Sequence, residues 1–118
     1  MAKHIETGKT GEKLAINWLK ERAYTILEQN WRHSRWEVDI IAEKGMVLHF
    51  IEIKTRRTSK FGLPEDSVGD KKIQNLINVA EQYLHQNPQW QRIQFNILSI
   101  LILQNQPPAY FLIEDVCL

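Results

Sequence analysis

The sequence lacks most of the features that would mark a secreted or membrane-spanning protein. Cys117 is the single cysteine among 118 residues, so no internal disulfide can form. The longest apolar run, residues 97–103, falls short of the roughly 20 residues that a membrane helix needs. The first six residues have no apolar signal-peptide core, and no repeat or low-complexity tract is present. We therefore expect a cytoplasmic protein with no membrane contact.

An excess of charge of one sign is also missing. Fifteen Lys and Arg residues balance 14 Asp and Glu residues, for a net charge of +1, so the overall charge does not indicate a nucleic-acid-binding protein. Basic side chains do cluster locally, at Arg32, His33 and Arg35 and again at Lys54, Arg56, Arg57 and Lys60. Charge alone favours solvated loops for both clusters. Their position on either side of an acidic pair also suits phosphate binding.

The chain length favours one domain, residues 1–118, with one core. Hydrophobic periodicity predicts helices at residues 11–22 and 70–86 and strands at 24–31, 36–42, 46–55, 92–103 and 109–113. Residues 7–11 are expected to be a flexible entry with a capping threonine, Lys44-Gly45 a tight turn, and residues 58–70 a loop. This order predicts an α/β fold, a mixed central sheet flanked by helices, in which the third and fourth strands are parallel.

Acidic side chains occur where the two central strands should be buried. Glu52 and Lys54 share one face at the end of an apolar strand, because side chains alternate along a strand. Asp39 lies on the preceding strand and should fall opposite residues 50–52 in a hairpin that turns at Lys44-Gly45. A buried charge without a partner is costly, so this pattern needs an explanation.

An acid followed by Glu-x-Lys is the arrangement that metal-dependent nucleases use to hold Mg²⁺ and activate water. Mg²⁺, or Mn²⁺ in its place, takes oxygen ligands and usually keeps several waters. Asp39 and Glu52 would bind the ion together with a backbone carbonyl, and Lys54 would orient the water or stabilise charge at phosphorus. Glu12 is a further candidate ligand. The plainer interpretation is that Glu52 and Lys54 simply pair at the solvent-facing end of the strand.

Several segments resemble the YraN family of bacterial proteins, and they cover nearly the whole chain in order. They are Gly8-x-x-Gly11-Glu12-x-x-Ala15, Asn30-Trp31-Arg32, Glu37-Val38-Asp39-Ile40-Ile41-Ala42, Phe50-Ile51-Glu52-Ile53-Lys54-Thr55-Arg56, Phe61-Gly62-x-Pro64 and Lys72-x-x-x-Leu76-x-x-x-Ala80-x-x-Tyr83-Leu84. The family is placed in the restriction-endonuclease-like superfamily and is similar in core to Holliday-junction resolvases.

The resemblance implies a PD-(D/E)xK nuclease core, with metal-ligand acids at Asp39 and Glu52, a catalytic lysine at Lys54 and a helix-borne acid at Glu12. It implies DNA as the partner and, by analogy alone, a homodimer. Lys72 falls where relatives commonly carry a lysine. Three positions depart from the pattern: Val38 replaces the proline of the motif, Trp36 a usual glycine and Asn96 a common aspartate.

Three functions stay open at this point. The first is a Mg²⁺-dependent nuclease that hydrolyses DNA phosphodiesters, with branched or damaged DNA as the preferred substrate. The second is a non-catalytic nucleic-acid-binding module of the same fold that contacts phosphates through basic side chains. The third is a protein-interaction module that uses an exposed Trp36 or the edge of the fifth strand. The candidate nucleic-acid contacts are Arg32, Arg35, Arg56, Arg57, Lys60 and Lys72.

Overall fold

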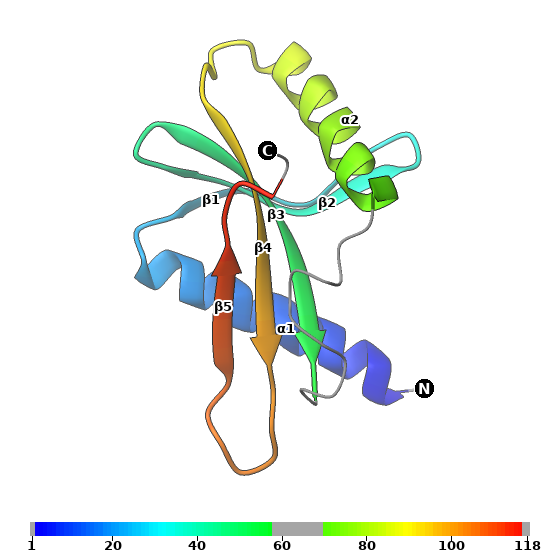
Figure 1. Cartoon of the computed structure of the whole chain (residues 1–118), viewed down its shortest axis with the longest axis vertical. Helices are drawn as coiled ribbons and strands as arrows, with labels where there is room; N and C mark the ends of the chain where they lie inside the picture. Colours follow the sequence, from blue (N-terminus) through cyan, green and yellow to red (C-terminus); the bar gives the residue numbers. More distant parts are fainter. Residues whose placement is uncertain (1, 58–69, 117–118) are drawn as a thin grey trace.

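A computed structural model describes residues 2–57 and 70–116, with side chains described for residues 10–57 and 73–116. Its elements are α1 (Ala2–Glu21), β1 (Thr25–His33), β2 (Trp36–Lys44), β3 (Val47–Arg56), α2 (Asp70–Gln86), β4 (Ile93–Leu101) and β5 (Ala109–Ile113). The strands form one sheet in the order β1-β2-β3-β4-β5. In Figure 1 the sheet runs through the middle of the molecule, with β5 on one side and the β1–β2 hairpin on the other.

Strand pairing follows the expected mixed pattern. β1, β2 and β3 are antiparallel neighbours, β3 and β4 are parallel, and β4 and β5 are antiparallel. The parallel step is made through α2, as a βαβ crossover requires. The model thus confirms a mixed α/β architecture with five strands and two helices.

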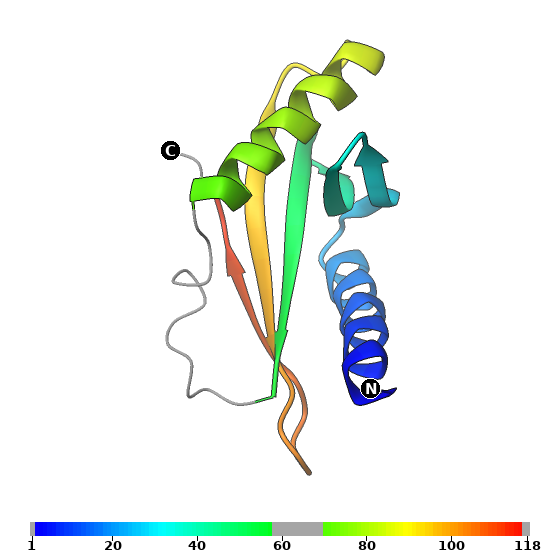
Figure 2. The same ribbon diagram turned by 90° about the vertical axis from the view of Figure 1, so that its right-hand side faces the viewer.

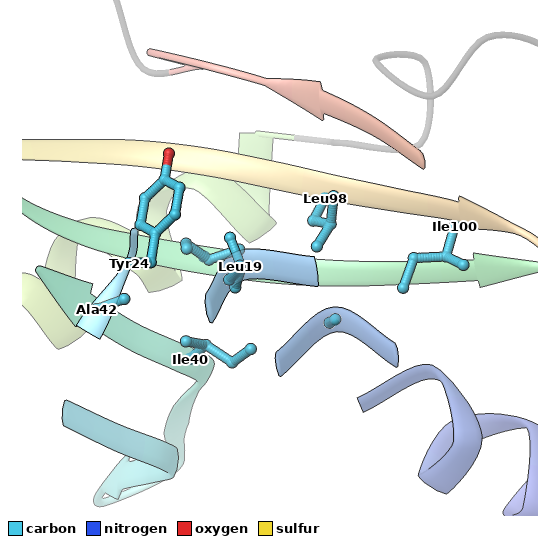
Figure 3. Packing of buried hydrophobic residues seen from close by; sticks show 8 residues of the cluster. Leu19, Tyr24, Ile40, Ala42, Leu98 and Ile100 are labelled. Atoms are coloured by element: carbon cyan, nitrogen blue, oxygen red, sulfur yellow. The ribbon is translucent and has the colours of Figure 1, made fainter. Parts of the chain in front are cut away.

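The two helices lie on opposite faces of the sheet, as Figure 2 shows. On the α1 face, Ala15 and Leu19 pack among the inward side chains of β2, β3 and β4, which include Ile40, Ile51 and Leu98. Figure 3 shows this cluster from close by, with Tyr24 at one end and Ile100 at the other. On the α2 face, a second cluster unites Val38, Ile41, Leu48, Phe50, Leu76, Val79, Ala80 and Tyr83. The sheet is therefore buried on both sides, which explains why β3 and β4 read as almost continuous apolar runs.

The first helix begins earlier than the sequence predicts. Residues 7–11 are not a flexible entry, because they lie inside α1. The two glycines suggested a break, yet Gly11 is buried against Thr55 of β3, where a larger residue would clash. Packing against the sheet therefore outweighs the low helix propensity of glycine, and Glu12 lies within the helix rather than in its first turn.

The end of α1 has a local cause. The amide of Tyr24 donates to the carbonyl of Leu19 and that of Ala23 to the carbonyl of Lys20, which is a Schellman arrangement. Ala23 takes the left-handed conformation, with φ of 70°. Leu19 and Tyr24 then pack together in the α1-face core. This turn sends the chain directly from the helix into β1.

Other element bounds shift by a few residues. The β2–β3 turn consists of Gly45 and Met46 rather than Lys44-Gly45, because Lys44 still pairs with Val47. Both turn residues have positive φ, 59° and 64°, as the common two-residue hairpin turn requires. β4 is shorter than predicted, whereas the predicted bounds of α2 and β5 are confirmed. The predicted loop at 58–70 lies, apart from Asp70, outside the described residues.

Candidate functional site

The candidate site lies where β2 and β3 separate. Their ladder runs from Lys44 opposite Val47 to Ile40 opposite Ile51 and goes no further, although β3 continues to Arg56. The next residues on the two strands are Asp39 and Glu52, the two acids predicted to lie opposite each other. The sheet therefore opens at the position where its central strands carry carboxylates.

One hydrogen bond fixes Asp39 at this opening. Its Oδ2 accepts from the backbone amide of Ile53, with the two atoms 2.8 Å apart. The carboxylate thus takes the place that a β2 carbonyl would hold if the ladder continued. It lies against the peptide group that joins Glu52 to Ile53, one residue before Lys54. The sequence suggested a backbone carbonyl as a metal ligand but gave no sign of the Ile53 amide as the anchor of Asp39.

Glu52 and Lys54 extend the α2-facing side of β3. Leu48 and Phe50 precede them on that side and are fully buried in the α2-face core. Glu52 is only 7% exposed and Lys54 is half-buried. The face thus changes from apolar to charged within one strand, as the sequence predicts. A carboxylate this deeply buried needs hydrogen bonds, a cation or both nearby to offset its lost hydration.

Glu12 approaches β3 from the other face. Its helix neighbour Gly11 is packed directly against Thr55, three residues beyond Glu52. Glu12 itself is half-buried. No group of three or more His, Cys, Asp or Glu side chains placed to hold a metal occurs within residues 10–57 and 73–116. Asp39 thus reaches β3 beside Glu52 through its bond to the Ile53 amide. Glu12 does not join them as the third member of a ligand cluster.

The donor set fits Mg²⁺ or Mn²⁺ by its chemistry. Mg²⁺ sites commonly use one or two carboxylates and leave the remaining positions to water and substrate phosphate. Asp39 has one oxygen on the Ile53 amide, which holds the carboxylate in a fixed orientation. Asp39 and Glu52 are the residues that would hold such an ion.

The basic candidates differ in their surroundings. Arg32 is paired with Glu37, its cross-strand neighbour, and its Nε donates to Oε2 of Glu37 at 3.1 Å. Arg57 is exposed. Arg56 is half-buried, and no acceptor in the described part of the chain reaches its buried Nε. Lys60, and the side chain of Lys72 in the first turn of α2, lie outside the described residues.

A buried polar pair on the α1 face was missed by sequence reasoning. Asn96 is fully buried, and its Nδ2 donates to Nδ1 of His49 at 2.9 Å. The backbone amide of Asp115 donates to the Asn96 carbonyl oxygen at 3.4 Å, which fixes the orientation of the amide group. Asn96 therefore acts as a donor to a neutral imidazole. The position had been noted only as a departure from the aspartate common in relatives.

This pair predicts a dependence of stability on pH. Burial lowers the pKa of His49, with Glu114 opposing the shift. Between the lowered folded-state pKa and about 6.5, the unfolded chain binds a proton that the folded chain does not, so stability falls as pH falls through that window. We expect the loss of stability between about pH 7.5 and 5.5, measured by urea unfolding, to shrink in His49→Gln. The exposed His85→Gln should behave like the unmodified protein, and an equal change in both variants would contradict the prediction.

Comparison with known proteins gives the chain its family. The model of the uncharacterised protein family UPF0102 matches residues 11–100, which include Glu12, Asp39, Glu52 and Lys54. The chain belongs to this family. A UPF0102 protein from Christiangramia forsetii is 43% identical over 101 residues, 86% of this chain and 85% of the relative. One from Dictyoglomus thermophilum is 43% identical over 98 residues, 82% of this chain and 83% of the relative.

The family assignment confirms the resemblance to YraN proteins that the sequence segments indicate. Similarity extends to a UPF0102 protein from Syntrophomonas wolfei, 41% identical over 98 residues, 82% of this chain and 85% of the relative. These relatives carry only the family name, which specifies neither a reaction nor a ligand. In the described part of the chain, no helix is long and apolar enough to cross a membrane.

Proposed function

We propose that this UPF0102 protein is a Mg²⁺- or Mn²⁺-dependent nuclease that hydrolyses DNA phosphodiesters on a restriction-endonuclease-like PD-(D/E)xK core. The observation that carries the proposal is the hydrogen bond from the Ile53 amide to Asp39, because it anchors that carboxylate between Glu52 and Lys54 on the neighbouring strand. An acid, a second acid and a lysine then lie at one opening of the sheet. This is the set of groups that phosphodiester hydrolysis needs.

Each residue has a chemical role in this proposal. Asp39 and Glu52 would hold the divalent ion, which supplies Lewis-acid polarisation of the phosphate and a more acidic bound water. Lys54 would donate to a non-bridging phosphate oxygen, where negative charge develops in the transition state. Glu12, next to the Gly11–Thr55 contact, would act through a water molecule rather than as a direct ligand.

The surroundings of the pair also support catalysis. Asp39 is held by a backbone amide of a buried strand, and Glu52 is nearly buried, so both carboxylates have little freedom to move. Fixed charged groups in a partly dry site stabilise a transition state better than mobile groups in water, because no reorganisation is needed during the reaction. Arg56 follows on the same face of β3, and its buried Nε is suited to an anionic oxygen.

Cleavage of a substrate panel tests the proposal. Purified protein would be incubated with four-way junction, flap, single-stranded and plain duplex DNA and with RNA, each with Mg²⁺, with Mn²⁺ and with EDTA. We expect metal-dependent cutting, strongest on branched or damaged DNA, and none in EDTA. Gel filtration of the same samples would test the homodimer that analogy with resolvases predicts. Absence of cutting on every substrate in both metals would contradict the nuclease proposal.

The runner-up is a nucleic-acid-binding module that performs no catalysis. It is favoured by the basic side chains that lie outside the carboxylate pair, above all exposed Arg35 and Arg57. Such a module would bind DNA in a salt-sensitive way, because phosphate contacts release counterions. Binding that is unchanged by EDTA, in a protein that cuts nothing, would favour it.

A further inference from the structure

The tip of the β1–β2 hairpin carries a row of aromatic rings. The rings of Trp31 and His33 lie nearly parallel, with centroids 6.4 Å apart and 14° between their planes. Those of His33 and Trp36 are 6.5 Å apart and inclined by 20°. Because His33 pairs directly with Trp36 across the hairpin, all three rings stand on one side of it. We call these three residues the hairpin stack.

The inner end of the stack belongs to the core. Trp31 meets the ring of Tyr83 on α2 edge-to-face, with centroids 5.2 Å apart, and so packs against the α2-face cluster to which Tyr83 belongs. In Figure 1 the hairpin reaches outward beside α2, and its tip points away from the rest of the sheet. Trp36 also packs against this cluster, so the core supports both tryptophans of the stack.

The outer end has a different character. Trp36 is half-buried rather than exposed, and the guanidinium carbon of Arg35, an exposed residue, lies 5.8 Å from its ring centroid. In the hairpin beneath it, Arg32 and Glu37 are joined across the strands and Ser34 lies in the turn with φ of 58°. Trp36 is thus a pre-positioned flat surface with a cation beside it, which lowers the entropy cost of binding a planar ligand.

The stack lies close to the candidate site. Trp36 precedes Asp39 by three residues on β2, a separation of roughly 10 Å along the strand. It packs against the α2-face cluster, and this is the face of the sheet on which Glu52 and Lys54 follow Phe50. A nucleic-acid strand whose phosphate reached Asp39 would therefore place a nearby base within reach of Trp36. Bases inside a duplex are already stacked on each other, so only an unpaired base offers a free face to an aromatic side chain.

We propose that the hairpin stack binds an unpaired nucleobase on the ring of Trp36, with Arg35 contacting the adjoining phosphate. The ligand class is nucleic acid with at least one unpaired nucleotide near the contacted phosphate. This proposal rests on the proposed nuclease function in one respect only, namely that the bound nucleic-acid strand continues to Asp39. Stacking is sequence-tolerant, so the stack selects for unpaired structure rather than for base sequence.

Binding without cleavage tests the stack separately from the nuclease. Fluorescence anisotropy in EDTA would compare a plain duplex, the same duplex with a one-nucleotide bulge, and unpaired DNA and RNA strands of the same sequence. We expect the bulged and unpaired ligands to bind more tightly than the duplex. Trp36→Leu should lose roughly tenfold in affinity for these ligands and little for the duplex, whereas Trp36→Phe should keep most of the affinity.

Two controls make the result decisive. Phe111→Leu alters an aromatic residue, 50% exposed, on the opposite edge strand β5 and should change no affinity. Arg35→Gln should weaken binding and reduce its salt dependence. Equal losses for duplex and unpaired ligands in Trp36→Leu, or no loss at all, would overturn the proposal, as would a protein that binds no nucleic acid at low salt. Cleavage without Trp36-dependent binding would contradict the stack proposal and leave the nuclease proposal intact. Trp36-dependent binding without any cleavage would contradict the nuclease proposal and leave the stack proposal intact.

Discussion

Replacing Asp39 with asparagine should abolish cleavage and leave the fold almost unchanged. Asparagine keeps a carbonyl oxygen that can accept from the Ile53 amide, so the 2.8 Å hydrogen bond at the opening of the sheet has a substitute acceptor. It removes the negative charge that would bind the divalent ion. We expect the cleavage rate to fall by about a hundredfold or more, the order found when a key electrostatic group is lost. Single-turnover cleavage and urea unfolding would be measured on the same preparation.

Alanine at position 39 separates the structural role of Asp39, as acceptor for the Ile53 amide, from its proposed role in metal binding. Asp39→Ala leaves the Ile53 amide without its acceptor in a half-buried position, which should cost about 1–3 kcal/mol of stability. Its cleavage rate should match that of Asp39→Asn. Glu37→Gln is a matched control on the same strand, because it removes a carboxylate that is paired with Arg32. If asparagine preserved activity and alanine lost activity only in proportion to stability, the role of Asp39 would be structural.

Adding one methyl group at Gly11 should destabilise the protein, although glycine is a poor helix residue. Alanine is favoured over glycine by about 1 kcal/mol in a helix interior. Here the added carbon would clash with Oγ1 of Thr55 and lie 3.2 Å from its Cβ. Overpacking of this kind typically costs about 1–3 kcal/mol, so the clash should outweigh the gain in propensity. We expect a lower thermal midpoint and, because Glu12 is the next residue, slower cleavage.

Two variants show whether the contact with Thr55 is the cause. Combining Gly11→Ala with Thr55→Ala removes the clashing hydroxyl, so the double variant should be at least as stable as Thr55→Ala alone. Asn17→Ala, at an exposed position of the same helix, should be neutral or slightly stabilising. If Gly11→Ala were more stable than the unmodified protein, helix α1 would not pack on β3 as described.

The fold was predictable where local signals agree with packing. Helix α2 has an apolar stripe and ends before Pro88, so its bounds follow from the sequence. The parallel pairing of β3 and β4 follows from the helix between them. The start of α1 was not predictable, because Gly11 packs closely against Thr55 of β3, and hydrophobic periodicity does not reveal such a tertiary contact.

The placement of the candidate residues was predictable in part. The sequence placed Asp39 opposite residues 50–52, and the register that ends with Ile40 opposite Ile51 agrees with this. The bond between Asp39 and the Ile53 amide depends on where two strands part, which no local pattern encodes. The contact between His49 and Asn96 joins residues 47 positions apart, and a single sequence carries no signal for it.

Binding of Mn²⁺ to the free protein tests the central claim most directly. Electron paramagnetic resonance would follow the signal of free Mn²⁺ during titration of the unmodified protein, Asp39→Asn, Glu52→Gln and the Glu37→Gln control. The account predicts a saturable millimolar or tighter site in the unmodified protein and in Glu37→Gln, and its loss in both Asp39→Asn and Glu52→Gln. Saturable binding that survives both substitutions, or no binding by the unmodified protein, would contradict the assignment of Asp39 and Glu52 as the metal ligands.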